Sequence, residues 1–204
     1  MVNTEVRRRR LSVDDRRTEL MLTCLRLIGT RPWDEVSMSE IAVAAGVSKP
    51  LLYHYFSTKS DLYVAAVRFA AHELSAATAP DPELPITQRL DEALGAHLDW
   101  IDEHALAYRA ILQGGISSNH DVQAIVEGSR ADVIARLAEA FAFGALSPAQ
   151  RISFRGWVGF LEAACLDWLV GRDITKQHLA RLLAASVSGA LRAAEVDPDL
   201  AHLS

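Results

Sequence analysis

A short run of side chains in the N-terminal part of the chain is suited to contacting nucleic acid. Lys49 can donate hydrogen bonds to guanine O6 or N7, and Leu51 can pack on a thymine methyl group. Ser48 and His54 can bond either a base edge or a phosphate. If this segment forms a helix, these four side chains and Tyr53 share its outward face. The run therefore indicates recognition of double-stranded DNA.

Residues 38–57, MSEIAVAAGVSKPLLYHYFS, supply a scaffold for that face. Their apolar residues fall where the two short helices of a helix-turn-helix must touch. Ala42 is small enough for a close crossing, and Gly46 allows the positive φ of the turn. The alternative is an incidental helical hairpin, although spacing, helix caps and charge all agree with the motif. The expected contact positions are Ile41, Ala42, Ala45, Val47, Leu52 and either Tyr55 or Phe56.

Charge is distributed unevenly along this chain of 204 residues with formal net charge −5. Residues 1–60 hold ten Arg and Lys against seven Asp and Glu, a net charge of +3, and the remainder carries −8. A basic end on an acidic body is expected if only that end meets a polyanion. A solvated basic tail without a partner is the alternative.

Helical periodicity dominates, and no alternating strand pattern is evident. Capping signals predict the first four helices at 12–28, 37–46, 48–56 and 58–77, with boxes pairing Ser12 with Asp15, Ser37 with Glu40 and Thr58 with Asp61. Three prolines in residues 79–85 indicate a loop. Longer helices are predicted beyond it, at 87–112, 119–143, 148–172 and 175–194. The expected fold is all-α, with about nine helices.

The stretch SMSEIAVAAGVSKPLLYHYFSTKSDLYVAAV, Ser37 to Val67, resembles the signature of the TetR family of bacterial transcriptional regulators. The resemblance implies a homodimer that binds a palindromic operator, usually as a repressor, and leaves it when a small molecule enters the C-terminal domain. It also implies phosphate contacts by Tyr53 and Lys59. The expected parts are a flexible basic arm (1–11), a helix-turn-helix domain (12–60), a connecting helix (61–78) and a ligand-binding and dimerisation domain (86–196).

The arm carries four consecutive arginines, among them Arg9 and Arg10, the two expected to contact DNA. Such an arm can enter an adjacent minor groove, where a narrow A·T-rich tract concentrates negative potential. Alternatively, it adds only non-specific attraction.

Two apolar stripes near the C-terminus predict the dimer interface, as the resemblance implies. They lie on the helices expected at 148–172 and 175–194 and step by three and four residues. The alternative is that both stripes belong to the intrachain core. The residues expected at the interface are Phe154, Trp168, Leu179, Leu183, Val187 and Ala190.

Aromatic residues are frequent beyond residue 86 and can line a cavity for an apolar or aromatic ligand. The alternative for each of them is ordinary core packing. The residues expected to contact the ligand are Trp100, His104, Tyr108, Phe141, Trp157, Phe160 and Cys165.

Other functions have weaker support. No Gly-rich phosphate loop, Gly-x-Ser-x-Gly elbow or His-Glu-x-x-His helix is present, so we expect neither an enzyme nor a cofactor. His97 and His104 with nearby carboxylates come nearest to a metal site, but these carboxylates are more typical of the solvent-exposed face of a helix. An effector-independent global or architectural DNA-binding protein is the competing hypothesis, and it predicts a filled core.

The apolar runs, the N-terminal residues and the two cysteines predict where the protein is located and whether its thiols are reduced. Without a long apolar run or a secretory signal, we expect a cytoplasmic protein with no membrane partner. Cys24 and Cys165 match no metal or redox spacing and are expected to be reduced core residues.

Overall fold

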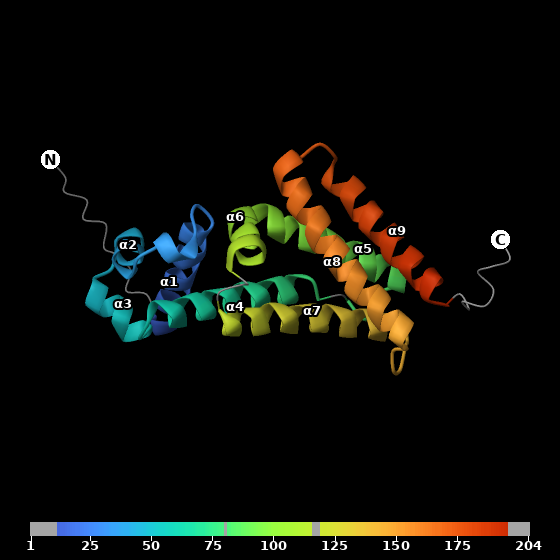
Figure 1. Ribbon diagram of the computed structural model, residues 1–204, viewed down its shortest axis with the longest axis horizontal. Coiled ribbons are helices and arrows are strands. Elements are labelled where there is room, and N and C mark those ends of the chain that lie inside the picture. The colour runs from blue at the N-terminus through green and yellow to red at the C-terminus, as the bar shows by residue number, and fades with distance from the viewer. Residues whose placement is uncertain (1–11, 80, 116–118, 196–204) are drawn as a thin grey trace.

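The computed structural model describes residues 12–79, 81–115 and 119–195. Every regular element in these ranges is helical, which confirms the predicted all-α class. The molecule is elongated, with three short N-terminal helices at one end and the longer C-terminal helices at the other (Figure 1). No helix in the described ranges is long and apolar enough to cross a membrane.

The N-terminal unit consists of α1 (Val13–Ile28), a 3₁₀ turn (Trp33–Glu35), α2 (Met38–Ala44) and α3 (Lys49–Tyr55). Both predicted capping boxes are present: the Ser12 hydroxyl accepts from the Asp15 amide at 3.0 Å, and the Ser37 hydroxyl from the Glu40 amide at 3.2 Å. These bonds satisfy amides that the first turn of a helix leaves free. The predicted starts of α1 and α2 are therefore confirmed.

The turn between α2 and α3 depends on Gly46, whose φ is 64°. A side chain disfavours this left-handed conformation, whereas glycine adopts it freely. After this turn, Ile41 of α2, Leu52 of α3 and Phe56 are all buried in one core cluster. Of the two aromatic candidates, Phe56 is buried and Tyr55 only half-buried.

Helix α4 (Lys59–Ala77) joins the two halves of the molecule. Its capping box pairs Thr58 with Asp61, as predicted. Its N-terminal half buries Leu62 and Tyr63 in the same core cluster as α1, α2 and α3. Its C-terminal half packs against the C-terminal helices.

The C-terminal part contains α5 (Ile86–Glu103), α6 (Ala105–Arg109), a π-helical turn (Ala110–Gly115), α7 (His120–Ala140), α8 (Pro148–Gly171) and α9 (Lys176–Glu195). Helices α5, α8 and α9 enclose a second core cluster that includes Leu98, Phe154 and Leu183. Both cysteines are buried and free, as expected. Burial raises the pKa of each thiol to about 12.

The predicted single helix 87–112 is wrong, because the chain breaks at His104. His104 has φ −113° and ψ 28°, its Nδ1 lies 2.9 Å from the Trp100 carbonyl oxygen, and its ring stacks on the Trp100 indole at 4.4 Å. A new helix then starts in a different direction as α6. No glycine or proline marks this break, so the helical periodicity alone predicted one continuous helix.

Candidate nucleic-acid interface and apolar cavity

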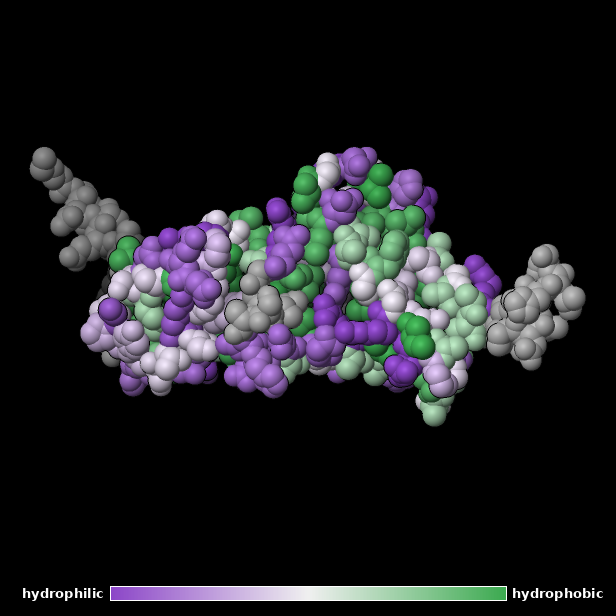
Figure 2. Space-filling view, viewed as in Figure 1, coloured by the Kyte–Doolittle hydropathy of each residue, from purple (hydrophilic) through white to green (hydrophobic). Residues whose placement is uncertain are grey.

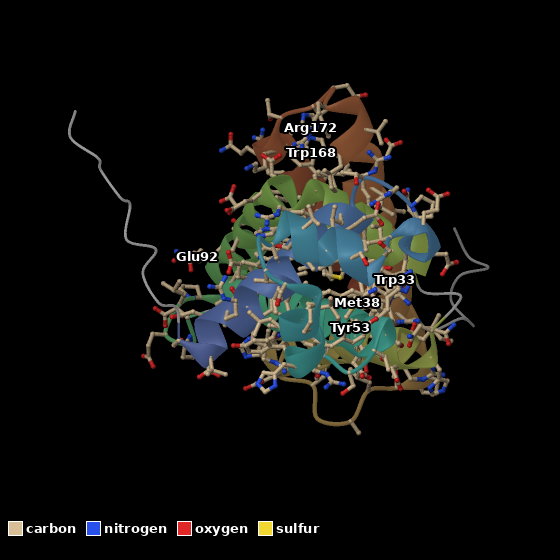
Figure 3. All side chains as sticks on the ribbon, turned by 90° about the vertical axis from the view of Figure 1, so that its left-hand side faces the viewer. Trp33, Met38, Tyr53, Glu92, Trp168 and Arg172 are labelled. Carbon is tan, nitrogen blue, oxygen red and sulfur yellow. The ribbon has the colours of Figure 1, made fainter. Side chains whose placement is uncertain are left out.

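Helix α3 presents its predicted polar face at one end of the molecule. The Ser48 hydroxyl caps the helix by accepting from the Leu51 amide at 3.3 Å. Opposite the buried Leu52, the side chains of Lys49, Leu51, Tyr53 and His54 are exposed. Tyr53 is 43% exposed, and Figure 3 looks onto the end of the molecule where it lies. The structure therefore brings all five predicted residues of this helix onto one accessible surface.

Arg17 is a further basic residue beside this surface that the sequence interpretation passed over. It lies on α1, donates to the Tyr55 carbonyl oxygen at 3.4 Å and stands 4.6 Å from the centroid of the Phe56 ring. Arg16, its neighbour, is paired with Glu19. The available signal was the Arg16-Arg17 pair in the first turns of α1. Arg16 has an acidic residue, Glu19, three positions further along, whereas Arg17 has none at that spacing.

Lys59 lies at the start of α4, where its ammonium group ties down the 3₁₀ turn. It donates to the Trp33 carbonyl oxygen at 2.7 Å and to that of Asp34 at 3.3 Å, and it lies 4.3 Å from the Trp33 ring centroid. An ammonium group has three N–H bonds, so one remains for a phosphate. Its phosphate contact stays a prediction, while Arg9 and Arg10 lie outside the described residues.

A cavity of about 200 Å³ lies among α4, α5, α6, α7 and α8. Most of its wall is aliphatic or aromatic. Of the residues expected to contact a ligand, the structure places Trp100, Tyr108, Phe141 and Trp157 in the wall.

The other three lie elsewhere. His104 stacks on Trp100 at the helix break, Phe160 points outward from α8 with 41% of its surface exposed, and Cys165 is sealed in the core.

His97 is a wall residue that the sequence interpretation considered only as a metal ligand. Its Nε2 atom is buried without a hydrogen-bond partner among the described residues. Burial, with a smaller effect from Arg136, lowers the pKa of the imidazole to about 4. The available signal was its position on the apolar face of α5, between Leu94 and Leu98.

The carboxylates of Asp99 and Asp102, near His97 in the sequence, pair with basic residues. Asp102 pairs with Arg172 at 2.6 Å, and both Asp99 and Asp102 accept from Lys176. The hydrogen bond from Arg172 is the main cause of a lowered pKa at Asp102. These ion pairs hold the end of α8 and the start of α9 against α5.

The residues expected at a dimer interface lie mainly inside the chain. Phe154, Trp168, Leu179, Leu183 and Val187 are buried in the core formed with α5, and Ala190 is half-buried. Periodicity identified the buried stripes of α8 and α9. They pack within the chain itself, which is the intrachain core given as the alternative to a dimer interface.

The opposite side of these two helices is accessible. We call it the outer face of α8 and α9, and over α8 its surface is mostly pale to green, from small and apolar residues (Figure 2). It carries the exposed large apolar side chains of Ile152, Phe160 and Leu182. Gly156 and Gly159 are also exposed there, and a β-carbon at either would meet nothing within 4 Å.

Comparison with known proteins places both halves of the chain. The family described as bacterial regulatory proteins, tetR family, matches residues 22–66, and the tetracyclin repressor-like C-terminal domain matches residues 86–189. A TetR-family transcriptional regulator from Streptomyces coelicolor has a similar structure, with a TM-score of 0.82 and 30% identity over 95% of this chain and 88% of that one.

Two curated relatives match over shorter stretches. The HTH-type transcriptional activator FasR of Mycolicibacterium smegmatis is 33% identical over 120 residues, 58% of this chain and 55% of FasR. The HTH-type transcriptional regulator BetI of Rhizobium meliloti is 47% identical over 53 residues, 26% of each chain. The matched stretches thus span about half of FasR and a quarter of BetI.

The helix-turn-helix geometry, the exposed face of α3 and the match of both domains lead to one conclusion. The chain belongs to the TetR family and is a DNA-binding transcriptional regulator.

Proposed function

We propose that the protein binds a palindromic operator as a homodimer, represses transcription there, and leaves the DNA when a small apolar or aromatic molecule fills the cavity. The observation that carries this proposal is the position of α4. Tyr63 in its first half is stacked on Trp33 of the DNA-binding unit at 4.4 Å, whereas Ala70 and Leu74 in its second half line the cavity. A ligand that moves this helix acts on both ends at once.

On DNA, α3 enters the major groove with its exposed face. Lys49 and His54 read base edges, Leu51 packs on a thymine methyl group, and Tyr53 contacts phosphate. Lys49 Nζ stands 6.0 Å from the Tyr53 ring centroid, so both side chains reach the same part of the groove. Ser48 holds the start of the helix while its hydroxyl remains open to a phosphate.

The outer face of α8 and α9 is the surface for the second copy. A glycine within a helix costs about 0.5–1 kcal/mol relative to alanine. A β-carbon at Gly156 or Gly159 would meet no atom of the described residues within 4 Å, so packing within the described part of the chain does not require glycine there. Small residues let a partner helix approach closely, and Phe160 beside them supplies apolar area. A two-fold axis here would present two α3 helices to half-sites about 34–36 Å apart, or a multiple of that.

The experiment is fluorescence anisotropy of full-length protein with fragments of the gene's upstream region, in a salt series with competitor DNA. Tyr53→Ala and Lys49→Ala should each weaken specific binding at least tenfold. Arg151→Ala is the matched control, because this exposed residue lies in the first turn of α8, at the opposite end of the molecule (Figure 1). Equal loss in all three variants, or binding indifferent to sequence, would contradict the proposal.

Two alternatives to an effector-released repressor can be tested: an activator and an effector-independent architectural protein. FasR is named an activator, so binding upstream that raises transcription in a reporter would reverse the sign of regulation while leaving the DNA contacts intact. An effector-independent architectural protein is disfavoured by the cavity, because it requires a filled core. Footprints at many unrelated sites would favour it.

A further inference from the structure

The cavity wall is apolar over most of its area, and its charged side chains already have partners among the described residues. Arg130 meets Glu162 through two bonds of 2.8 and 2.7 Å. Arg89 donates to the carbonyl oxygens of Leu84 and Pro82 at 2.6 Å each. The carboxylate in the wall is therefore neutralised, and Arg89 is held against the backbone of its own loop.

Arg136 is the remaining cation of the wall, and it is held in a similar way. It donates to the Ser75 carbonyl oxygen at 3.2 Å and to the Thr78 hydroxyl at 3.4 Å, at the C-terminal end of α4. This end of a helix carries the negative side of its dipole, which favours the cation where it is. Its charge thus has a favourable site without a ligand.

Two wall residues differ from these, because their buried polar atoms have no hydrogen-bond partner among the described residues. They are His97 Nε2 from α5 and the Tyr108 hydroxyl from α6. The two rings meet edge to face with centroids 6.1 Å apart. Leaving a buried polar group without a partner is unfavourable, so native proteins rarely do so. Because the two rings touch in one cavity wall, their polar atoms are placed to bind the same polar group of a ligand.

Both groups are uncharged near neutral pH. Burial lowers the pKa of His97 and raises that of Tyr108 well above its usual value. The His97 Nε2 atom of a neutral imidazole donates or accepts one hydrogen bond, depending on the tautomer, and the Tyr108 hydroxyl can donate one and accept one. Neither group neutralises a charge. An uncharged hydroxyl or carbonyl is the group that pairs with both without bringing an unpaired charge into an apolar cavity.

The volume limits the rest of the ligand. An apolar cavity of about 150 Å³ holds benzene, so about 200 Å³ accommodates a benzene ring with a short substituent. We propose that the cavity binds an uncharged compound of about this size whose single hydroxyl or carbonyl group is bound by His97 and Tyr108. This inference rests on the proposed function, in which the cavity is the effector site, and it names the class of effector.

Three matched probes test the head group: ethylbenzene, 4-ethylphenol and 4-ethylbenzoate, each titrated calorimetrically into the full-length protein. We expect 4-ethylphenol to bind at least tenfold more tightly than the other two, a difference of about 1.4 kcal/mol. Equal affinity for ethylbenzene would show a cavity that selects only shape. Preference for 4-ethylbenzoate would show that Arg89 or Arg136 selects an anion. Either result, or no binding of any probe, overturns the proposal.

Tyr108→Phe separates recognition from folding. Because it removes a buried hydroxyl without a partner, the variant should be as stable as the original protein or more so. Its affinity for 4-ethylphenol should nevertheless fall severalfold toward that for ethylbenzene, because only His97 remains to bind the phenol hydroxyl. Tyr63→Phe is the matched control, because it also removes a tyrosine hydroxyl but at a residue outside the cavity wall, and it should keep the preference for the phenol. A preference unchanged in Tyr108→Phe would contradict the assignment.

Operator binding is measured in parallel, so that the two proposals can fail separately. If 4-ethylphenol binds with the expected preference but leaves operator affinity unchanged, the cavity chemistry stands and the effector role fails. If a charged compound releases the operator while the phenol is not preferred, the proposed function stands and the inference about ligand class fails.

Discussion

Gly29, at the end of α1, lies directly against Leu106 of α6. A β-carbon at position 29 would stand 2.9 Å from the Leu106 backbone carbonyl carbon, closer than side chains pack. Since α6 also carries Tyr108 of the cavity wall, this contact joins the wall to the DNA-binding unit independently of α4.

Gly29→Ala should therefore destabilise the protein by about 1–3 kcal/mol, because the added methyl group meets backbone that cannot turn aside. Urea denaturation measures the change. Gly95→Ala on α5, where a β-carbon would meet nothing within 4 Å, is the control and should be neutral or stabilising. If the two variants proved equally stable, α1 and α6 would not be in contact in solution.

Lys59→Met tests the dual position of the lysine. The methionine stem can still cover Trp33, but the bonds to the Trp33 and Asp34 carbonyl oxygens are lost, so stability should fall by about 1–2 kcal/mol. If the remaining N–H meets a phosphate, the slope of log K against log salt should also drop by about 1. Lys176→Met should leave the slope as it was, because Lys176 is paired with Asp99 and Asp102 of α5. An unchanged slope in Lys59→Met would limit that residue to holding the turn.

Gly159→Glu should convert the protein to a monomer by placing a charge on the outer face of α8 and α9. Sedimentation equilibrium gives the mass, and operator affinity should fall with it. Gly128→Glu is the matched control, because Gly128 is an exposed helical glycine on α7 with equally open surroundings. A dimer that survives Gly159→Glu and dissociates in Gly128→Glu would move the interface to α7.

His97 makes stability depend on pH. Its pKa of about 4 in the folded protein lies below the usual 6.5, so the unfolded chain binds the proton more readily between these values. The contribution is therefore complete above pH 6.5 and lost as the pH falls toward 4. We expect about 2 kcal/mol less stability from this residue at pH 5 than at pH 7.

Urea titrations of the original protein and His97→Gln at both pH values isolate the effect. Tyr108 meets the His97 ring edge to face, and burial raises the pKa of its phenol well above the usual value, so Tyr108 stays protonated at both pH values. The free energy of unfolding of the original protein should fall relative to that of His97→Gln as the pH falls from 7 to 5. A difference independent of pH would mean that His97 is solvated.

Features set by neighbouring residues could be predicted from the sequence. The caps at Ser12, Ser37 and Thr58 and the left-handed Gly46 depend on atoms within a few residues, so local rules suffice. The exposed face of α3 followed directly, because the register of a seven-residue helix is fixed once Leu52 is buried.

Features set by distant packing could not. Periodicity showed that Phe154 and Leu183 are buried, but not whether the covering surface is α5 of the same chain or a second copy. The break at His104 depends on its contact with Trp100, and the role of His97 on Tyr108, which α6 brings to it only after that break.

The division of α4 has an evolutionary consequence. The residues of α4 that face the cavity include the small Ala70 and Ala71. None of the described residues that line the cavity belongs to α3. Substitutions there can reshape the effector site while the DNA-reading surface stays intact, and changes at Lys49 or Leu51 can retarget the operator without altering the cavity. After gene duplication, sensing and targeting can thus diverge one at a time.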